Sequence, residues 1–225
     1  GITLYGFGYY ALGTFIHPLE QEFHWGRAEV ATGFIVFALV GALLRPVFGA
    51  LLDRWGPRRL AVPGAILLGL VFASFSTLTG SRMQWLGLWL ALALASGMIM
   101  PSVWGMAVAR SFVASRGLAV SGMMLGSAGG AILAPQLSNH LIKLHGWRTA
   151  YRVMGLSWGA VVAVICLLML RDGRDRSLAA ANPLPQVELT GYTVLDGIRS
   201  AHFIKIVASI FISNLFNYFF SFHLL

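Results

Sequence analysis

The sequence predicts an all-α integral membrane protein with six complete membrane-spanning helices and the beginning of a seventh. Hydrophobic residues make up 57% of the chain, charged residues make up only 11%, and the mean hydropathy is +0.75. Soluble domains carry about 25% charged residues, so a water-soluble globule is excluded. Apolar runs of about 20 residues, the length that crosses a bilayer, recur with short polar breaks between them. They lack the alternation of polar and apolar residues that marks a barrel strand.

Each apolar run is expected to be a helix, because only helices and closed barrels satisfy the backbone inside lipid. The chain begins and ends within apolar runs and lacks an initiator Met, so we expect a fragment of a longer protein. Residues 1–170 should form a six-helix bundle, 171–202 a cytoplasmic linker, and 203–225 a truncated seventh helix. The runs are 2–16, 30–52, 60–78, 85–109, 118–142, 153–170 and 203–225.

Most of the Arg and Lys residues fall in every second polar break, on the side where the chain would begin. The positive-inside rule then predicts a multi-pass protein of the plasma (inner) membrane with a cytoplasmic N-terminus. This distribution explains the formal net charge of +8 without nucleic acid as a partner. Trp25, Trp85 and Trp147 fall at outer helix ends, where we expect them to anchor at the lipid headgroups.

Nothing in the sequence indicates an enzyme, a cofactor or a metal site. Cys166 is the single cysteine, which excludes an internal disulfide and a multi-cysteine metal site. His140 and His145 lie close in sequence but lack a third ligand, so we expect no metal there. No nucleophile triad or phosphate-binding loop is present.

The first three runs resemble the next three in the placement of Arg, Gly and Pro. A shift of 89 positions aligns four residues, and one inserted residue then aligns Gly56 and Arg58 with Gly146 and Arg148. Because each unit has three spans, the second copy would be inverted, as in the nested repeats of secondary transporters. The alternative is a chance coincidence of residues that are common in membrane helices. The four aligned pairs are Arg27 with Arg116, Gly33 with Gly122, Gly41 with Gly130 and Pro46 with Pro135.

The break between the second and third runs reads Gly49-Ala-Leu-Leu-Asp53-Arg54-Trp-Gly56-Pro-Arg58-Arg59. It resembles the signature loop of the major facilitator superfamily, Gly-x-x-x-Asp-Arg-x-Gly-x-Arg-Arg, at every defining position. The glycines suit close helix approach and a tight turn. The resemblance implies that Asp53, Arg54, Arg58 and Arg59 stabilise the outward-facing state by contacting the other half. The alternative is a basic loop that serves orientation only.

Weaker patterns are similar to the monocarboxylate and oxalate/formate porter group. They are Pro18-Leu-x-x-Glu22-Phe-x-Trp25-x-Arg27-Ala-Glu29, Arg116-Gly-Leu-Ala and Gly146-Trp147-Arg148. The resemblance implies a secondary transporter of small organic carboxylates that rocks two six-helix halves, of which the C-terminal half is missing here. A non-transporting solute sensor, or a transporter of drugs or sugars, stays open as an alternative.

The resemblance implies that the first, fourth, seventh and tenth helices face the central cavity, and the first three of these fall within this sequence. The resemblance therefore implies candidate path residues on these helices, although aromatic residues in membrane helices also pack or lie at the interface. The candidates are Tyr5, Tyr9, Tyr10, Met100, Trp104, Asn214, Asn217 and Tyr218.

Two stripes of small residues suggest helix contacts. Gly122, Gly126 and Gly130 recur every fourth residue before Pro135 and form one close-packing face, either against the missing half or within this one. Gly41, Arg45, Gly49 and Asp53 form a similar stripe on the second run. Arg45 lies roughly 12 Å deeper in the membrane than Asp53 at a helical rise of about 1.5 Å per residue. It therefore belongs either to an inner gate or anion path, or it extends its side chain to the headgroups.

Overall fold

The computed structural model describes residues 2–111, 116–170, 200, 204–205, 207–209 and 212–213; the side chains of 2–10, 12, 109–111, 116 and 169 fall outside that description. The described residues contain helices and no strand. The chain divides into two compact units, residues 1–179 and 180–225. Within the second unit, the described residues of 204–213 are helical. The first unit contains α1 (Ile2–Phe23), α2 (Arg27–Trp55), α3 (Pro57–Ser74), η1 (Phe75–Thr77), α4 (Arg82–Gly97), α5 (Pro101–Ser111) and α6 (Arg116–Met169).

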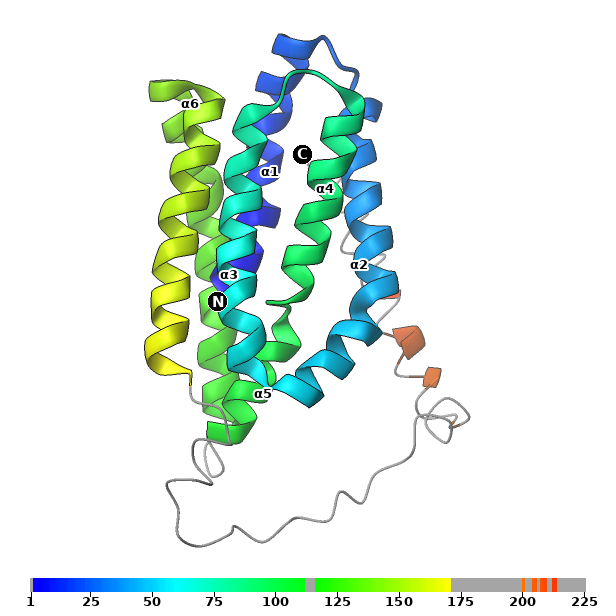
Figure 1. The fold of residues 1–225 in the computed structure, drawn as a ribbon, viewed down its shortest axis with the longest axis vertical. Helices are drawn as coiled ribbons and strands as arrows, with labels where there is room; N and C mark the ends of the chain where they lie inside the picture. Colours follow the sequence, from blue (N-terminus) through cyan, green and yellow to red (C-terminus); the bar gives the residue numbers. More distant parts are fainter. Residues whose placement is uncertain are drawn as a thin grey trace, which may run out of the picture. The chain divides into compact units, whose positions relative to one another are not determined.

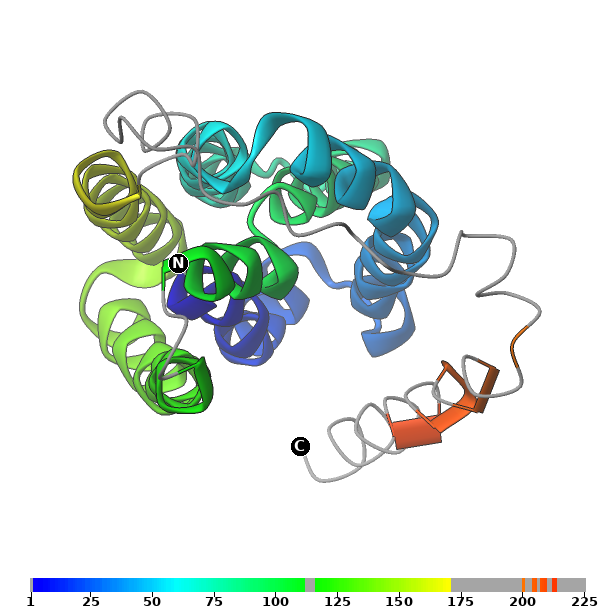
Figure 2. The ribbon, with the colours of Figure 1, turned by 90° about the horizontal axis from the view of Figure 1, so that it is seen from below.

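The helices of the first unit run up and down beside one another in Figure 1, and Figure 2 shows them close to end-on. Four of the described helical stretches are long and apolar enough to cross a membrane, namely Arg27–Trp55, Pro57–Thr77, Arg82–Val108 and Gly117–Leu168. The helix α1, which is rich in tyrosine and glycine, is not among them. The last stretch has 52 residues, roughly twice what one crossing requires.

Gly146 interrupts α6, which is otherwise continuous through the polar break that separates the fifth and sixth apolar runs. Its φ of 78° and ψ of 163° are not helical. In Figure 1 the chain of α6 turns back at the upper end of the picture, between its green and its yellow part. A positive φ favours glycine because a side chain would clash with the neighbouring carbonyl. The fifth and sixth apolar runs are thus joined by a bend at one residue and not by an extended loop. The predicted packing residue Pro135 lies inside α6 and does not end the helix.

The fourth apolar run, expected as one helix over 85–109, is broken between α4 and α5. Met98 and Ile99 donate their N–H groups three residues back, to Ala95 at 3.2 Å and Ser96 at 3.1 Å. Pro101 then begins α5, and its ring and missing N–H prevent a regular helix from running through.

Aromatic rings fill the centre of the bundle. Tyr151 of α6 is completely buried and stacks on Phe15 of α1, with ring centroids 3.8 Å apart, and on Phe75, 5.4 Å away. Trp85 and Trp89 of α4 meet Phe75 edge to face at 5.7 and 5.8 Å. These contacts link α1, η1, α4 and α6 in one core.

The expectation that three tryptophans anchor at headgroups is wrong. Trp25, Trp85 and Trp147 expose only 9%, 2% and 7% of their surface. Trp25 packs on Trp85 with ring centroids 5.5 Å apart, and Trp147 packs edge to face on Phe23 at 6.0 Å. Burial of apolar area and the contacts between aromatic rings stabilise the tryptophans in these positions.

Close approach of α3 and α6 depends on glycines. A methyl group added at Gly69 would lie 2.7 Å from the carbonyl oxygen of Gly155 and 2.9 Å from the Cα of Gly159. Added at Gly159, it would lie 2.8 Å from the Cα of Gly69. The two backbones therefore touch directly, as membrane helices do where small residues face each other.

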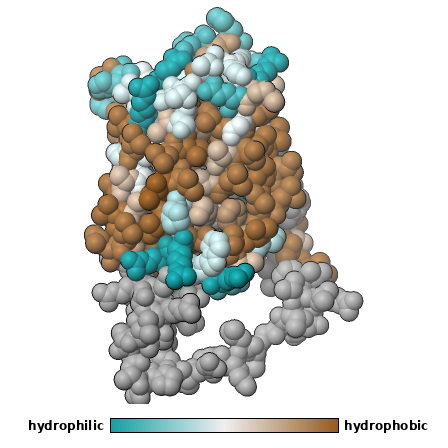
Figure 3. Space-filling model, viewed as in Figure 1, coloured by the Kyte–Doolittle hydropathy of each residue, from teal (hydrophilic) through white to brown (hydrophobic). Residues whose placement is uncertain are grey.

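Large apolar side chains cover the outside of the described helices. On α2, Ile35, Leu39, Leu43 and Val47 each expose 51% or more of their surface. Figure 3 shows hydrophobic side chains in a broad band around the middle of this face, with hydrophilic ones at the upper and lower ends. Such a band is far larger than the apolar patches of soluble monomers. The fold is that of a multi-pass membrane protein.

Candidate functional site

The predicted signature loop is a tight turn between α2 and α3. Gly56 adopts φ 83° and ψ 167°, and its N–H donates to the carbonyl of Leu52 at 2.9 Å. Pro57 follows at the first position of α3, where its missing N–H has no helical partner to lose. The turn needs a glycine at position 56, which the sequence pattern predicted.

The charges of this loop lie at the surface. Asp53, Arg54 and Arg59 are exposed and make no hydrogen bond or ion pair with the described part of the chain. Arg58 is half-buried, and its Nη2 donates to the carbonyl of Leu167 near the end of α6, 3.4 Å away. The loop therefore joins α3 to α6 through one arginine and presents a carboxylate that could pair with another segment.

The Gly41, Arg45, Gly49 and Asp53 stripe faces away from the other described helices. A methyl group added at Gly41 or Gly49 would meet no atom within 4 Å. Arg45 is exposed and has no polar partner within residues 2–111 and 116–170. The stripe is open to lipid, to water or to a further helix.

The predicted path residues fall into three groups. The side chains of Tyr5, Tyr9 and Tyr10 and the whole of Asn214, Asn217 and Tyr218 lie outside the described part of the chain. Met100 is half-buried and packs on the core beside the break between α4 and α5. The indole Nε1 of Trp104, which is also half-buried, donates to the carbonyl of Ile99 at 3.0 Å. The carbonyl of Ile99 is free to accept this bond, because the N–H of Val103, its partner in a regular helix, donates to the carbonyl of Met100 instead.

The predicted packing face on α6 is partly open. A methyl group at Gly122 would meet no atom within 4 Å, whereas Gly126 and Pro135 are half-buried and Gly130 is buried. Two glycines outside this predicted face are in closer contact with a neighbouring side chain. A methyl group would lie 2.1 Å from Trp89 if added at Gly33 and 2.2 Å from Phe48 if added at Gly97.

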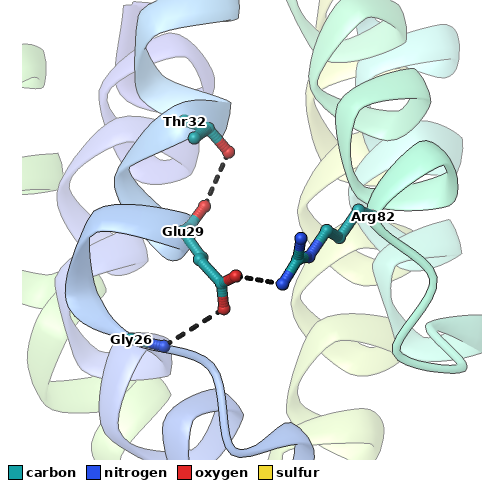
Figure 4. Close-up of polar contacts among 4 residues, drawn as sticks. All are labelled: Gly26, Glu29, Thr32 and Arg82. Atoms are coloured by element: carbon teal, nitrogen blue, oxygen red, sulfur yellow. Dashed lines mark hydrogen bonds and ion pairs between the residues drawn. The ribbon is translucent and has the colours of Figure 1, made fainter.

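Sequence reasoning missed a network of carboxylates and arginines at the end of the bundle opposite the signature loop. Glu29 near the start of α2 pairs with Arg82 at the start of α4 and also accepts the N–H of Gly26 at 3.3 Å, while Thr32 donates to its carbonyl (Figure 4). Glu20 pairs with Arg27 at 3.6 Å.

Within this network, Glu22 contacts the residues that lie farthest from it in the sequence. One oxygen, Oε2, accepts the indole N–H of Trp147 at 2.6 Å, and the other, Oε1, lies 2.5 Å from Nη1 of Arg148. Two of the sequence patterns noted above, one around Glu22 and one at Gly146-Trp147-Arg148, thus meet in space. Their shared resemblance to one transporter group was the only signal that could have linked them.

The pKa of Glu22 is lowered by these contacts. Desolvation raises it, but the hydrogen bonds from Trp147 and Arg148 and the charge of Arg148 outweigh that effect. Glu22 therefore stays ionised near neutral pH, which suits an ion pair and not a proton carrier. Within the described residues, no three His, Cys, Asp or Glu side chains lie together as metal ligands would.

Comparison with known proteins gives one family and one group of relatives. Residues 1–225 match the family described as Major Facilitator Superfamily. Monocarboxylate transporter 11 of Mus musculus is 29% identical over 154 residues, which are 64% of this chain and 32% of the relative. Monocarboxylate transporter 11 of Homo sapiens is 29% identical over 150 residues, 64% of this chain and 31% of the relative. The chain spans about a third of the length of these relatives.

Proposed function

This chain belongs to the major facilitator superfamily, and on that premise we propose that it forms one half of a secondary transporter that moves a small solute by alternating access. The observation that carries the proposal is the α2–α3 turn. Its residues follow the pattern of the family's signature loop, its Gly56 adopts the positive φ of a tight turn, and its Asp53 is exposed and unpaired within the described chain. A carboxylate so placed can pair with a second bundle in one state and release it in the other.

We propose that the half consists of six crossings in two inverted three-helix repeats. Gly56 and Gly146, which the repeat alignment pairs, have nearly the same backbone, with φ of 83° and 78° and ψ of 167° and 163°. Gly69 and Gly159, which the same alignment pairs, touch each other where α3 crosses α6. Contact between equivalent residues is expected on an axis that relates the two copies, and transporter repeats are related by such an axis.

We propose a small organic carboxylate as the substrate class. The names of the relatives support this class, and Arg45 supports it physically. A membrane-depth arginine costs about 2.5 to 3.5 kcal/mol unless a counter-ion, carbonyl or water compensates it. An anionic substrate that enters along the stripe from Asp53 would supply that counter-ion. The protein acts without a cofactor or chemical step in this scheme.

The proposal places the chain in the plasma (inner) membrane with its N-terminus in the cytoplasm. Residues 171–202 then form the cytoplasmic linker, and 203–225 begin the second bundle. The signature loop lies on the cytoplasmic side and the Glu22 network on the outer side. The second bundle completes the transport path and provides the partners of Asp53, Arg54 and Arg59.

The test is flux through the full-length protein in proteoliposomes, with radiolabelled L-lactate as probe and a panel of unlabelled carboxylates, sugars and drugs as competitors. We expect lactate flux that carboxylates inhibit, and a loss of flux in Asp53→Asn with unchanged membrane insertion. Glu20→Gln, a carboxylate change at the other end, serves as the control. Lactate binding without flux would instead indicate a sensor, and inhibition by sugars or drugs alone would indicate another substrate class.

A further inference from the structure

The described structure joins the end of α1 to the bend of α6 through one carboxylate. Glu22 lies in the last turn of α1, and its partners Trp147 and Arg148 directly follow Gly146. Each carboxylate oxygen has its own donor, the indole N–H at 2.6 Å and the guanidinium at 2.5 Å. Because the two donors come from consecutive residues, the carboxylate fixes the direction in which the chain leaves the bend.

Arg148 extends the connection to a third segment. Its Nη2 donates to the carbonyl of Leu78, in the turn between η1 and α4, at 3.1 Å. Its guanidinium carbon lies 4.3 Å from the centre of the Trp147 ring, a cation–π distance. One turn later, Nε of Arg152 donates to the hydroxyl of buried Ser76 at 3.0 Å. The end of α1, the α3–α4 turn and the bend of α6 are thus held together at one point.

The neighbouring carboxylates Glu20 and Glu29 do not connect α1 to α6. Glu20 pairs with Arg27, across the short connection from α1 to α2. Glu29 pairs with Arg82 and so links α2 to α4. In the described part of the chain, Glu22 is the carboxylate that ties α1 to α6. A partly exposed ion pair alone contributes little, but a carboxylate whose two oxygens each accept a separate donor, one of them charged, is more costly to remove.

We propose that Glu22 is a positioning residue for transport, which fixes the outer end of α1 to the α6 bend so that α1 keeps its place while the half rocks. The inference rests on the proposed function, because α1 carries the predicted path residues Tyr5, Tyr9 and Tyr10. Twelve residues separate Tyr10 from Glu22, roughly 18 Å along a helix, so Glu22 acts through α1 and not by touching solute. The ionised state that its lowered pKa provides is the state that both donors require.

The first test needs no substrate. Hydrogen exchange of the full-length protein in lipid nanodiscs is measured for peptides that cover 18–23 and 146–152. Loss of the carboxylate in Glu22→Gln should speed exchange about tenfold in both segments together, since local opening then no longer breaks an ion pair. The control Glu20→Gln should change both by less than about twofold, because the single partner of Glu20 in the described chain is the exposed Arg27 at 3.6 Å and the pair ties no helix to α6.

A double-mutant cycle separates this role from general packing. Trp147→Phe keeps an aromatic ring but removes both the N–H that Glu22 accepts and part of the surface that packs on Phe23, and the cycle cancels the packing part because it is lost in both backgrounds. If Glu22 acts through its two donors, the effects of Glu22→Gln and Trp147→Phe on exchange should be clearly non-additive. Additive effects, or unchanged exchange in Glu22→Gln, would overturn the proposal, whether or not the protein carries lactate.

The second test measures L-lactate flux in proteoliposomes. Glu22→Gln should lower the maximal rate about tenfold with KM within about twofold, because an interaction needed for movement and not for binding is lost. Glu22→Asp should recover much of the rate. A rise in KM alone would place Glu22 in the solute path and overturn the positioning role. Absence of lactate flux in the unaltered protein would overturn the proposed substrate class, and the exchange data would then decide on Glu22.

Discussion

Arg58 and Arg148 make matching hydrogen bonds at opposite ends of the same pair of helical segments. Arg58, at the start of α3, donates to Leu167 near the end of α6, and Arg148, just after the α6 bend, donates to Leu78 beyond the end of α3. Each arginine follows a positive-φ glycine by two residues. In both places an arginine side chain therefore donates to a carbonyl near the end of a helix, where the backbone leaves carbonyls without donors.

The bend at Gly146 leads to the first prediction. Gly146→Ala should destabilise the protein by about 1 to 2 kcal/mol, because φ of 78° is unfavourable for an L-residue with a side chain. The cost is purely conformational, since a methyl group there would meet no atom within 4 Å. The measurement is the midpoint of thermal unfolding of the full-length protein in detergent.

Gly129→Ala is the matched control for that experiment. Gly129 lies inside α6 but outside the predicted packing face, and a methyl group there also meets nothing within 4 Å among the described residues. Alanine should leave the midpoint unchanged or raise it, because it favours a helix over glycine by up to about 1 kcal/mol. Equal effects at the two positions would contradict the role given to the bend.

The second prediction concerns the crossing of α3 and α6. Gly69→Ala should destabilise the protein by about 1 to 3 kcal/mol, since the added methyl group would overlap backbone atoms of Gly155 and Gly159 and the helices must separate. Gly87→Ala in α4, where no atom lies within 4 Å, should be neutral or mildly stabilising. Unfolding midpoints compare the two. An unchanged midpoint in Gly69→Ala would mean that the crossing is loose.

The third prediction follows from the lowered pKa of Glu22. A carboxyl group whose pKa is lower in the folded state stabilises that state above its ordinary pKa of 4.5, and this contribution fades as the pH falls through the folded value. The stability difference between the unaltered protein and Glu22→Gln should therefore be constant from about pH 7 to pH 5 and shrink only below that. Unfolding midpoints of both proteins from about pH 7 down to about pH 4 provide the test. A difference that disappears between about pH 7 and pH 6 would contradict the pairing with Arg148.

The tight turn at Gly56 was predictable because its cause is local. A glycine followed by a proline within a short polar break between apolar runs needs no knowledge of distant residues. The bend at Gly146 was marked by its alignment with Gly56, although its form, a single non-helical residue inside α6, was not foreseen. The break before Pro101 was missed because the apolar run continues through it, even though the proline itself was a visible signal.

The contacts that sequence reasoning missed join residues far apart in the chain. Nothing near Glu22 indicates that its partners are Trp147 and Arg148, since both carboxylates and arginines usually face water at helix ends. Trp25 and Trp85 were assigned to the headgroups for the same reason. A tryptophan at a helix end can face lipid or a neighbouring helix, and only the packing of α1, α2 and α4 decides between them. The gating and path assignments for Asp53, Arg45 and the tyrosines stay predictions.

The fourth prediction addresses Arg45, the charged residue inside the α2 span. It is exposed, and the described chain gives it no counter-ion, so its partner is lipid, water, solute or a further helix. If it attracts an anionic solute, Arg45→Gln should lower L-lactate flux of the full-length protein by at least about tenfold, equivalent to about 1.4 kcal/mol. Arg45→Lys keeps the charge but not the planar fork, so it should retain partial flux.

Arg27→Gln is the control for this charge removal. Arg27 is also an arginine of α2, but it lies at the opposite end of the helix and pairs with Glu20. Its loss should leave flux within about twofold, because exposed ion pairs contribute little. Membrane insertion of all three variants is checked by expression and detergent extraction. If Arg45→Gln transports normally, Arg45 either extends its side chain to the headgroups or packs against a further helix, because a residue with one of those roles can lose its charge without cost to transport.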